Sequence, residues 1–461
     1  MFKTLKNAWK VPELQKKLLF TLLIIFLYRL GANIPVPYVS GDLFSQSAYS
    51  GTILDFMNLL SGGSLGQATI LALGVQPYIT ASIVMQLLTI AIPALERLSK
   101  EGDEGKKKIT AITRLVTVAL ALITSVGYTK LIADTEGMAV VDINAFRYMV
   151  LIACYCAGAA LVMWMAEKIN DHGIGNGISM ILFANIIAGT SGLVATLWNQ
   201  VFPATGFSWV GLIISLVELL CVVGFIVLIV WMSDAERRIP IQYAKRVVGR
   251  KMYGGQNSNL PLKVNMSGVM PIIFANSIVA IPSTIAVMFF TNKTNWFTHL
   301  INADWGFITN MENSGLAKFL ASICGFNYGT WPYVLVFLVL LMLFAFFYIA
   351  ISFNPVEVAN NIKSNGGAIP GIRSGKPTAD FIKKVLNRIT LVGALLVAFI
   401  AVVPMAVNII LLYIPYFQNL GGLGSMAFGG SSIMIVVGVA LETVRELEAQ
   451  LSLRNYKGFL D

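Results

Sequence analysis

The chain has 461 residues, of which 56% are hydrophobic and only 12% are charged, and its formal net charge is +10. Its mean hydropathy is +0.74. Soluble domains carry about a quarter charged residues, so this composition excludes a soluble protein and predicts a polytopic membrane protein.

Ten apolar runs are long enough to cross a bilayer as helices, which takes about 20 mostly apolar residues. The run at 174–195 is the weakest, because Gly and Asn interrupt it. No alternating ten-residue pattern dominates, which disfavours a β-barrel. The first run follows a basic N-terminus and has no small-residue cleavage site after it, so we expect a retained span. The ten runs are 17–34, 70–95, 109–131, 147–167, 174–195, 209–232, 266–290, 332–353, 388–413 and 428–447.

The segment 51–68, GTILDFMNLLSGGSLGQA, lies between the first two runs and is too short to cross. Its apolar residues fill one or two helical turns before a Ser-Gly-Gly break. Such a segment is re-entrant or lies in the outer half of the protein, where protein or water must satisfy its backbone. Its pattern alone favours an outer amphipathic helix and a movable stopper about equally.

Aliphatic residues recur at helical spacing inside the runs. Ile79 and Ile83 are four residues apart and share a helix face, as do Leu182 and Ile186. Periodicity alone favours ordinary packing here.

Polar and charged residues also occur inside the runs. The polar ones on the second and seventh runs predict interhelical hydrogen bonds, each worth only about 0.6 kcal/mol on average. Arg114 and Glu218 are charged within spans and are therefore functional candidates. Arg114 is also close enough to the inner end of its span to snorkel.

No motif in the chain indicates catalysis. The sequence GIGNG at 173–177 superficially resembles a dinucleotide-binding loop, but it follows no strand and opens a span. It predicts a tightly packed helix start. We find no Walker A, HExxH or Ser-His-Asp pattern, and we interpret the four cysteines as packing residues. The sequence therefore predicts no enzyme, no cofactor and no metal site.

The distribution of positive charge predicts the orientation. With the N-terminus inside, most of the 33 Lys and Arg residues fall on inner segments. The positive-inside rule then places both termini in the cytoplasm. The inner loops at about 233–265 and 354–387 have cations to spare for a partner, such as ribosomal RNA phosphates or an acidic protein surface.

The ten runs divide into two sets of five, at 1–204 and 205–461. An odd number of spans in each half makes the second half enter from the opposite side, as in inverted-repeat transporters. The repeat rests on this parity alone, because the two halves show no direct sequence similarity.

Several motifs that occur in the expected order resemble the SecY/Sec61 alpha family of protein-conducting channels. The resemblance implies an all-α polytopic fold with ten transmembrane helices in two inverted five-helix halves around a central pore. It also implies that unfolded secretory proteins cross the bacterial plasma membrane here, and that transmembrane segments leave through a lateral gate. The motifs are YAKR (243–246), LPLKVN (260–265), GVQPYITASI (74–83), GIGNGIS (173–179), NMSGVMPIIFA (265–275) and GGSSIMIVV (429–437).

The resemblance assigns roles to particular positions. The implied pore ring is Ile79, Ile83, Leu182, Ile186, Ile273 and Ile435. The implied plug, within 51–68, is Ile53, Leu54, Phe56, Met57, Leu59, Leu60, Ser61, Gly62 and Gly63. The implied lateral gate includes Thr80, Gln86, Asn276 and Ser277. The residues implied to dock a cytosolic partner are Lys245, Arg246, Arg250, Lys251 and Arg373.

The resemblance also implies partners. These are SecE-like and SecG-like small membrane subunits, the SecA ATPase, a translating ribosome, signal-peptide-bearing preproteins and membrane lipids. Two other functions stay open on the residues alone, a secondary transporter and an insertase or scaffold without a continuous pore. A transporter would need ionisable or coordinating residues at the midplane, whereas the candidate pore faces here are aliphatic.

Overall fold

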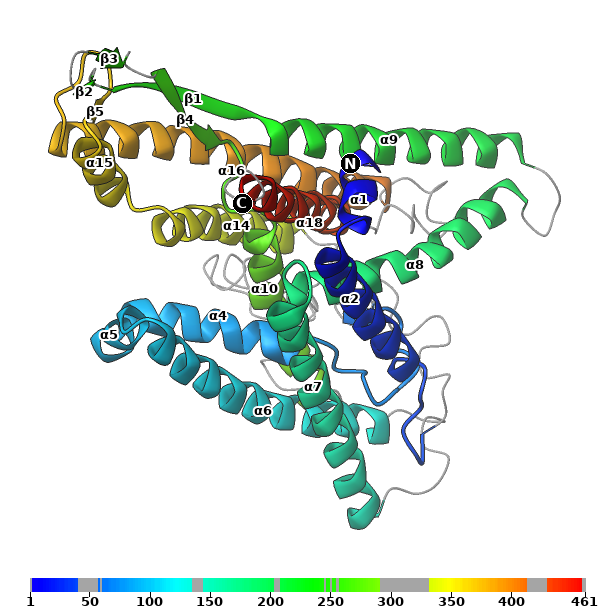
Figure 1. Ribbon diagram of the computed structural model, residues 1–461. Coiled ribbons are helices and arrows are strands. Elements are labelled where there is room, and N and C mark those ends of the chain that lie inside the picture. Colours follow the sequence, from blue (N-terminus) through cyan, green and yellow to red (C-terminus); the bar gives the residue numbers. More distant parts are fainter. Residues whose placement is uncertain are drawn as a thin grey trace, which may run out of the picture.

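Long helices make up most of the molecule (Figure 1). The computed structural model describes residues 2–39, 57–58, 60–134, 144–202, 208–243, 246–248, 251–253, 257–290, 331–412 and 429–457. The helices are α1 (Phe2–Trp9), α2 (Pro12–Gly31), α4 (Gln76–Ala91), α5 (Pro93–Lys100), α6 (Asp103–Asp134), α7 (Ala145–His172), α8 (Gly177–Val201), α9 (Trp209–Asp234), α10 (Met270–Phe290), α14 (Trp331–Ser352), α15 (Pro355–Ser364), α16 (Lys376–Leu412) and α18 (Gly430–Lys457).

Each predicted span overlaps one of the long helices. A single apolar run in lipid can satisfy the hydrogen-bonding groups of its own backbone only by forming a helix. Within the described residues, five helices are long and apolar enough to cross a membrane, or six if α4 and α5, bent by 99°, count as one span. Two further helices have shorter apolar stretches, Gly177–Thr190 and Met270–Ile281. The arrangement of ten spans in two halves stays a prediction.

The largest hydrophobic core joins helices from both ends of the sequence. It includes buried residues of α2, α4, α7 and α8 together with residues of α9, α10, α14, α16 and α18. Helix α10 contacts α4 and α6 on one side and α14 on the other, and Figure 1 shows it between these two groups. Helix α10 is therefore one of the elements that join the N-terminal and the C-terminal helices.

The two basic loops at 233–265 and 354–387 form a small β-sheet that the sequence did not predict. Strands β1 (Glu236–Tyr243) and β4 (Asn257–Lys263) pair antiparallel, and β5 (Gly367–Ala368) pairs with the end of β1. Strands β2 (Arg246–Val248) and β3 (Lys251–Tyr253) form a separate hairpin. Ile239 and Ile241 of β1 are buried in a core shared with α15 and α16. The loops at 233–265 and 354–387 are thus one structural unit.

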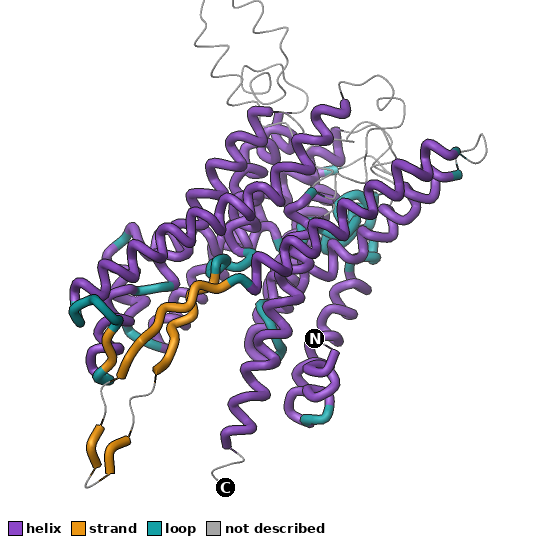
Figure 2. Tube along the Cα trace, turned by 90° about the horizontal axis from the view of Figure 1, so that it is seen from above, coloured by secondary structure: helices purple, strands orange, loops and turns teal. Residues whose placement is uncertain are grey.

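Figure 2 shows the strands and both chain ends at the same end of the helical bundle. The N-terminal helix α1 also contacts α18, and Thr4 Oγ1 donates a 2.9 Å hydrogen bond to Glu448 Oε1. The basic segments that the sequence assigns to one side of the membrane therefore lie together in space.

Candidate functional site

The six aliphatic residues of the predicted pore ring all belong to the largest hydrophobic core of the described residues. Ile79 and Ile83 lie on α4, Leu182 and Ile186 on α8, and the other two on α10 and α18. Each of the six is at most 3% exposed, and all belong to the same hydrophobic cluster. Four helices thus contribute branched hydrocarbon side chains to this core.

Part of the predicted plug lies beside this cluster. Ile53, Leu54, Phe56 and Leu59 fall outside the described residues. Leu60 packs against the cluster that contains the six aliphatic residues, and Met57 packs against a second cluster. A cavity of about 20 Å³ is lined by Met57, Leu60, Leu182 and neighbouring residues. That volume holds about one water, so the segment fits closely against α4 and α8.

Hydrogen bonds close the described plug residues into a compact turn. The Asn58 Oδ1 atom accepts from the Gly66 amide at 2.8 Å, and the Ser61 Oγ atom accepts from the Leu65 amide at 3.1 Å. The Ser61 hydroxyl also donates to the Asn58 carbonyl at 2.9 Å. The Ser-Gly-Gly break in the sequence is therefore an ordered turn.

The predicted gate residues make few bonds between helices. Thr80 and Ser277 each donate to a carbonyl of their own helix, at 3.1 and 2.8 Å. Gln86 of α4 accepts from the Tyr348 hydroxyl of α14 at 3.1 Å. Asn276 is 2% exposed, and within the described residues neither polar atom of its side chain has a hydrogen-bond partner. The contact between α4 and α10 is therefore mainly apolar.

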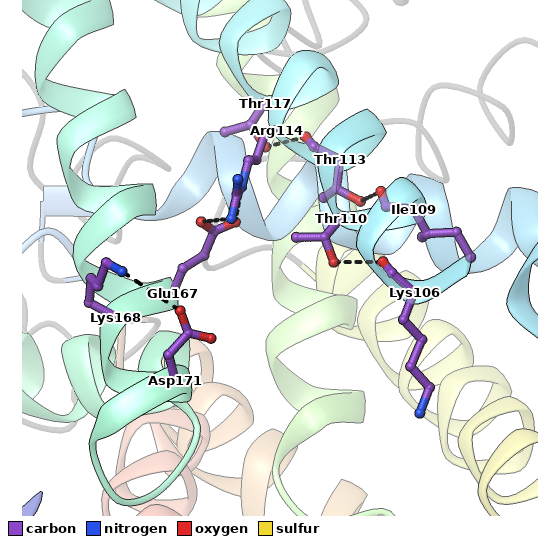
Figure 3. Close-up of polar contacts among 9 residues, drawn as sticks. All are labelled: Lys106, Ile109, Thr110, Thr113, Arg114, Thr117, Glu167, Lys168 and Asp171. Carbon is purple, nitrogen blue, oxygen red and sulfur yellow. Dashed lines mark hydrogen bonds and ion pairs between the residues drawn. The ribbon is translucent and has the colours of Figure 1, made fainter. Parts of the chain in front are cut away.

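Arg114 has a partner that the sequence did not reveal. Figure 3 shows its guanidinium directed at Glu167 of α7, with a 2.9 Å bond from Nε to Oε1 and a 2.8 Å contact from Nη2 to Oε2. Such two-point geometry is the strong form of an arginine–carboxylate pair. The side chain of Glu167 is 11% exposed. Arg114 therefore does not only extend toward the membrane surface. Its guanidinium also joins α6 to α7.

The predicted docking residues lie on the β-strand side of the molecule. Arg373 is exposed on a turn between β5 and α16. Gly371 and Gly375 flank it with φ values of +80° and +102°, which favour glycine, and the Arg373 carbonyl accepts from Thr378 Oγ1 at 2.8 Å. Lys245 and Arg250 lie outside the described residues, while Arg246 and Lys251 belong to the β2–β3 hairpin.

Two cationic residues near the strands, Arg445 and Lys263, are partly buried and lie among structural contacts. Arg445 Nη2 donates to the Ser233 carbonyl at 2.5 Å and to Asp234 Oδ1 at 2.8 Å, which ties α18 to the end of α9. Partial burial, together with the positive charge of Arg445, lowers the pKa of Lys263 on β4. The exposed Arg373 is therefore better placed than Lys263 to meet a partner.

Comparison with known proteins identifies the family. A family model described as SecY matches residues 69–444. The chain belongs to the SecY family. A relative named protein translocase subunit SecY, from Streptomyces coelicolor, is 43% identical over 477 residues and is matched over 100% of both chains. The resemblance found in the sequence is thereby confirmed, and the chain is a multi-pass membrane protein of a translocase family.

Solved structures of SecY-family channels share the fold. One of them is a SecY structure from work that reports that the plug domain stabilises the closed state of the translocation channel. It has a TM-score of 0.56 at 18% identity and covers 94% of this chain and 92% of that one. Sec61 in a canine ribosome–channel complex has a TM-score of 0.55 at 17% identity, with the same coverage. At these identities the likeness concerns the fold alone.

Two residues of the site were not found from the SecY-like motifs. Asn185 of α8 and Arg29 of α2 both contact the described plug residues. An Asn within an apolar run is a signal that the sequence did offer, because polar residues within spans tend to be functional. Their partners could not be read from sequence, since the contacts join segments far apart in the chain.

Proposed function

We propose that this chain forms the channel through which unfolded secretory proteins cross a bacterial plasma membrane. The path runs through the ring of Ile79, Ile83, Leu182, Ile186, Ile273 and Ile435. The observation that carries the proposal is the burial of all six in one cluster, with Leu60 packed against it. The chain itself has no catalytic role and takes no cofactor.

An aliphatic ring suits a passage for polypeptides. Apolar constrictions block ions by excluding water, and side chains without hydrogen-bonding groups do not hold a passing peptide. Flexible aliphatic groups also close around chains of different width. The described plug residues, of which Leu60 packs against the core that contains the ring, cover the ring on one side in the resting channel.

The lateral gate opens along the contact of α4 and α10, with α6 and α14 beside it. The support is that Thr80 and Ser277 bond only their own helices among the described contacts, and Gln86 makes one bond to α14. An apolar segment gains about 0.8 kcal/mol for each CH₂ it buries in lipid. A few such groups outweigh a seam with little hydrogen bonding, so apolar segments leave sideways and polar ones pass on.

Replacing Asn276 with leucine should make the gate harder to open. A buried polar group without a partner costs about 1–3 kcal/mol, and leucine of similar size removes this cost from the closed seam. We expect segments of borderline hydrophobicity to insert several-fold less often, measured with a series of model segments of graded hydrophobicity. Ser277→Ala is the matched control, because that hydroxyl bonds its own helix. Equal or greater insertion in Asn276→Leu would reject this account of the gate.

The partner that feeds the channel docks at the strand end, where Arg373 is exposed. SecA or a translating ribosome binds there through Arg373 and the β2–β3 hairpin, which carries Arg246 and Lys251. Small SecE-like and SecG-like subunits complete the complex in the membrane. Both termini and the β-strands then face the cytoplasm.

Import of a preprotein into reconstituted vesicles tests the function and the docking site together. Wild-type channels with SecA and ATP should give a protease-protected product. Arg373→Glu should lower the yield of this product by about tenfold or more, because a charge contact that becomes buried in the complex is worth a few kcal/mol. Lys363→Glu, an equal charge change at another exposed site on the same side, should import normally. An equal loss in both variants would remove the specific role of Arg373, and no import by wild type would contradict the function.

A further inference from the structure

Three side chains outside the plug hold the described plug residues by their backbone. Asn185 Nδ2 donates to the Leu60 carbonyl at 2.8 Å and to the Tyr28 hydroxyl at 2.9 Å. Arg29 Nη1 donates to the Gly62 carbonyl at 3.3 Å and to Asn185 Oδ1 at 3.4 Å. We propose that Tyr28, Arg29 and Asn185 form a clasp that keeps the channel closed, and that Asn185 is its central positioning residue. This inference rests on the proposed function.

The orientation of the Asn185 amide follows from its partners. A carbonyl can only accept and a guanidinium can only donate. The amide nitrogen must therefore face Leu60, and its oxygen must face Arg29. Both N–H groups of the amide are used, and the side chain is fully buried. Leucine, aspartate or a flipped amide cannot make the same set of bonds.

Gly62 fits the clasp because it has no side chain. Its φ is +67°, a conformation that favours glycine. A Cβ atom there would overlap Arg29 Nη1 and come within 2.9 Å of Asn185 Oδ1. The guanidinium thus reaches the backbone through the space that the glycine leaves open.

The clasp residues form hydrogen bonds with the backbone of the plug and not with its side chains. Its acceptors on the plug are the carbonyls of Leu60 and Gly62, and Tyr128 of α6 adds a 2.5 Å bond to the Leu65 carbonyl. Changes to plug side chains other than at Gly62 leave these acceptor groups in place. The stability of the closed state is therefore set in good part by α2, α6 and α8.

The clasp also accounts for the position of Arg29. Arginine is uncommon on the outer side of a membrane protein because of the positive-inside rule, and the topology predicted above places Arg29 there. Its two contacts give it a role at that depth. When the plug moves away, water in the open pore replaces the lost partners, so the bonds break without leaving buried polar groups and the closure is reversible.

Resting ion flux tests the clasp. Wild-type and variant channels, complete with their small membrane subunits, are reconstituted into vesicles, and chloride efflux is followed with a halide-sensitive dye. Asn185→Leu should raise resting chloride efflux by about tenfold or more. It removes both N–H donors of the amide and leaves the Leu60 carbonyl without its hydrogen-bond donor. Tyr28→Phe, which keeps the ring and its packing, should give a smaller rise. It also provides the test if the leucine variant does not fold.

The matched control is Ser179→Ala on the same helix. Ser179 is buried, and within the described residues its hydroxyl has no hydrogen-bond partner, so resting efflux should equal that of wild type. Wild-type efflux in both Asn185→Leu and Tyr28→Phe would overturn the clasp. A rise as large in Ser179→Ala would overturn it as well. Preprotein import by wild type in the same vesicles reports on the proposed function separately, so the two failures can be told apart.

Discussion

Replacing Ile83 with aspartate should produce a channel that conducts small ions without a substrate. Ile83 is 2% exposed and lies in the largest hydrophobic core, together with the other five residues of the proposed ring. An unpaired carboxylate in such a place costs the closed state several kcal/mol, and about 1.4 kcal/mol corresponds to a factor of ten. We expect the ratio of closed to open channels to fall by about a hundredfold. Resting ion flux in vesicles measures this change.

The control for this variant is Ile83→Leu, which conserves volume and apolar character. Such exchanges cost less than about 1.5 kcal/mol, so the leucine channel should stay closed to ions and should still import a preprotein. If aspartate at this position left resting ion flux unchanged in a protein that inserts normally, the ring would not be the barrier.

Replacing Arg114 with leucine should be among the most destabilising single changes in the membrane part of the chain. It leaves the Glu167 carboxylate, whose side chain is 11% exposed, without its two-point partner. Removing one member of a fully buried ion pair costs about 3–5 kcal/mol, and the cost here is smaller because the Arg114 side chain is 53% exposed. We expect a loss of folded protein and a lower Tm in detergent, since α6 and α7 lose a two-point polar contact.

The double variant Arg114→Leu, Glu167→Leu distinguishes a charge effect from a packing effect. Replacing both members of a buried pair with apolar residues is often neutral or stabilising. The double variant should therefore recover most of the Tm lost in Arg114→Leu. A double variant that is less stable than Arg114→Leu would mean that the pair is needed for something other than neutralising Glu167.

Apolar runs made the helices predictable, because lipid leaves a spanning backbone few alternatives. Helix ends were less predictable. Helix α16 begins at Lys376, well before the predicted start at 388. Lys383, Lys384 and Arg388 lie in that stretch, and Lys and Arg are good helix formers in water. Charge marks where a membrane span ends, but it does not end the helix.

The small sheet was missed although its pattern was present. Ile239, Ile241 and Tyr243 occupy every second position along β1, which is typical of a half-buried strand. Pro240 between them argues against a central strand, yet β1 lies between β4 and β5. The partner β5 comes from a loop over a hundred residues later, and no local pattern indicates such a pairing.

For the candidate site, motifs located residues but not their partners. Ile79, Ile273 and Ile435 come from three helices that are far apart in the sequence. Their assignment to one ring follows from the SecY resemblance and not from periodicity. The Arg114–Glu167 pair and the clasp around Asn185 depend on how helices pack. Packing of this kind lies beyond what one sequence determines.

Cross-linking of a stalled secretory chain tests the central claim most directly. Single cysteines replace Ile83 or Ile273 in a background without the four native cysteines, and a third variant carries cysteine at Leu220, which is 67% exposed on α9. A translocating chain that carries one thiol-reactive group should link to positions 83 and 273 and leave position 220 unmodified. Linkage at 220 without linkage at 83 or 273 would contradict a path through the aliphatic ring.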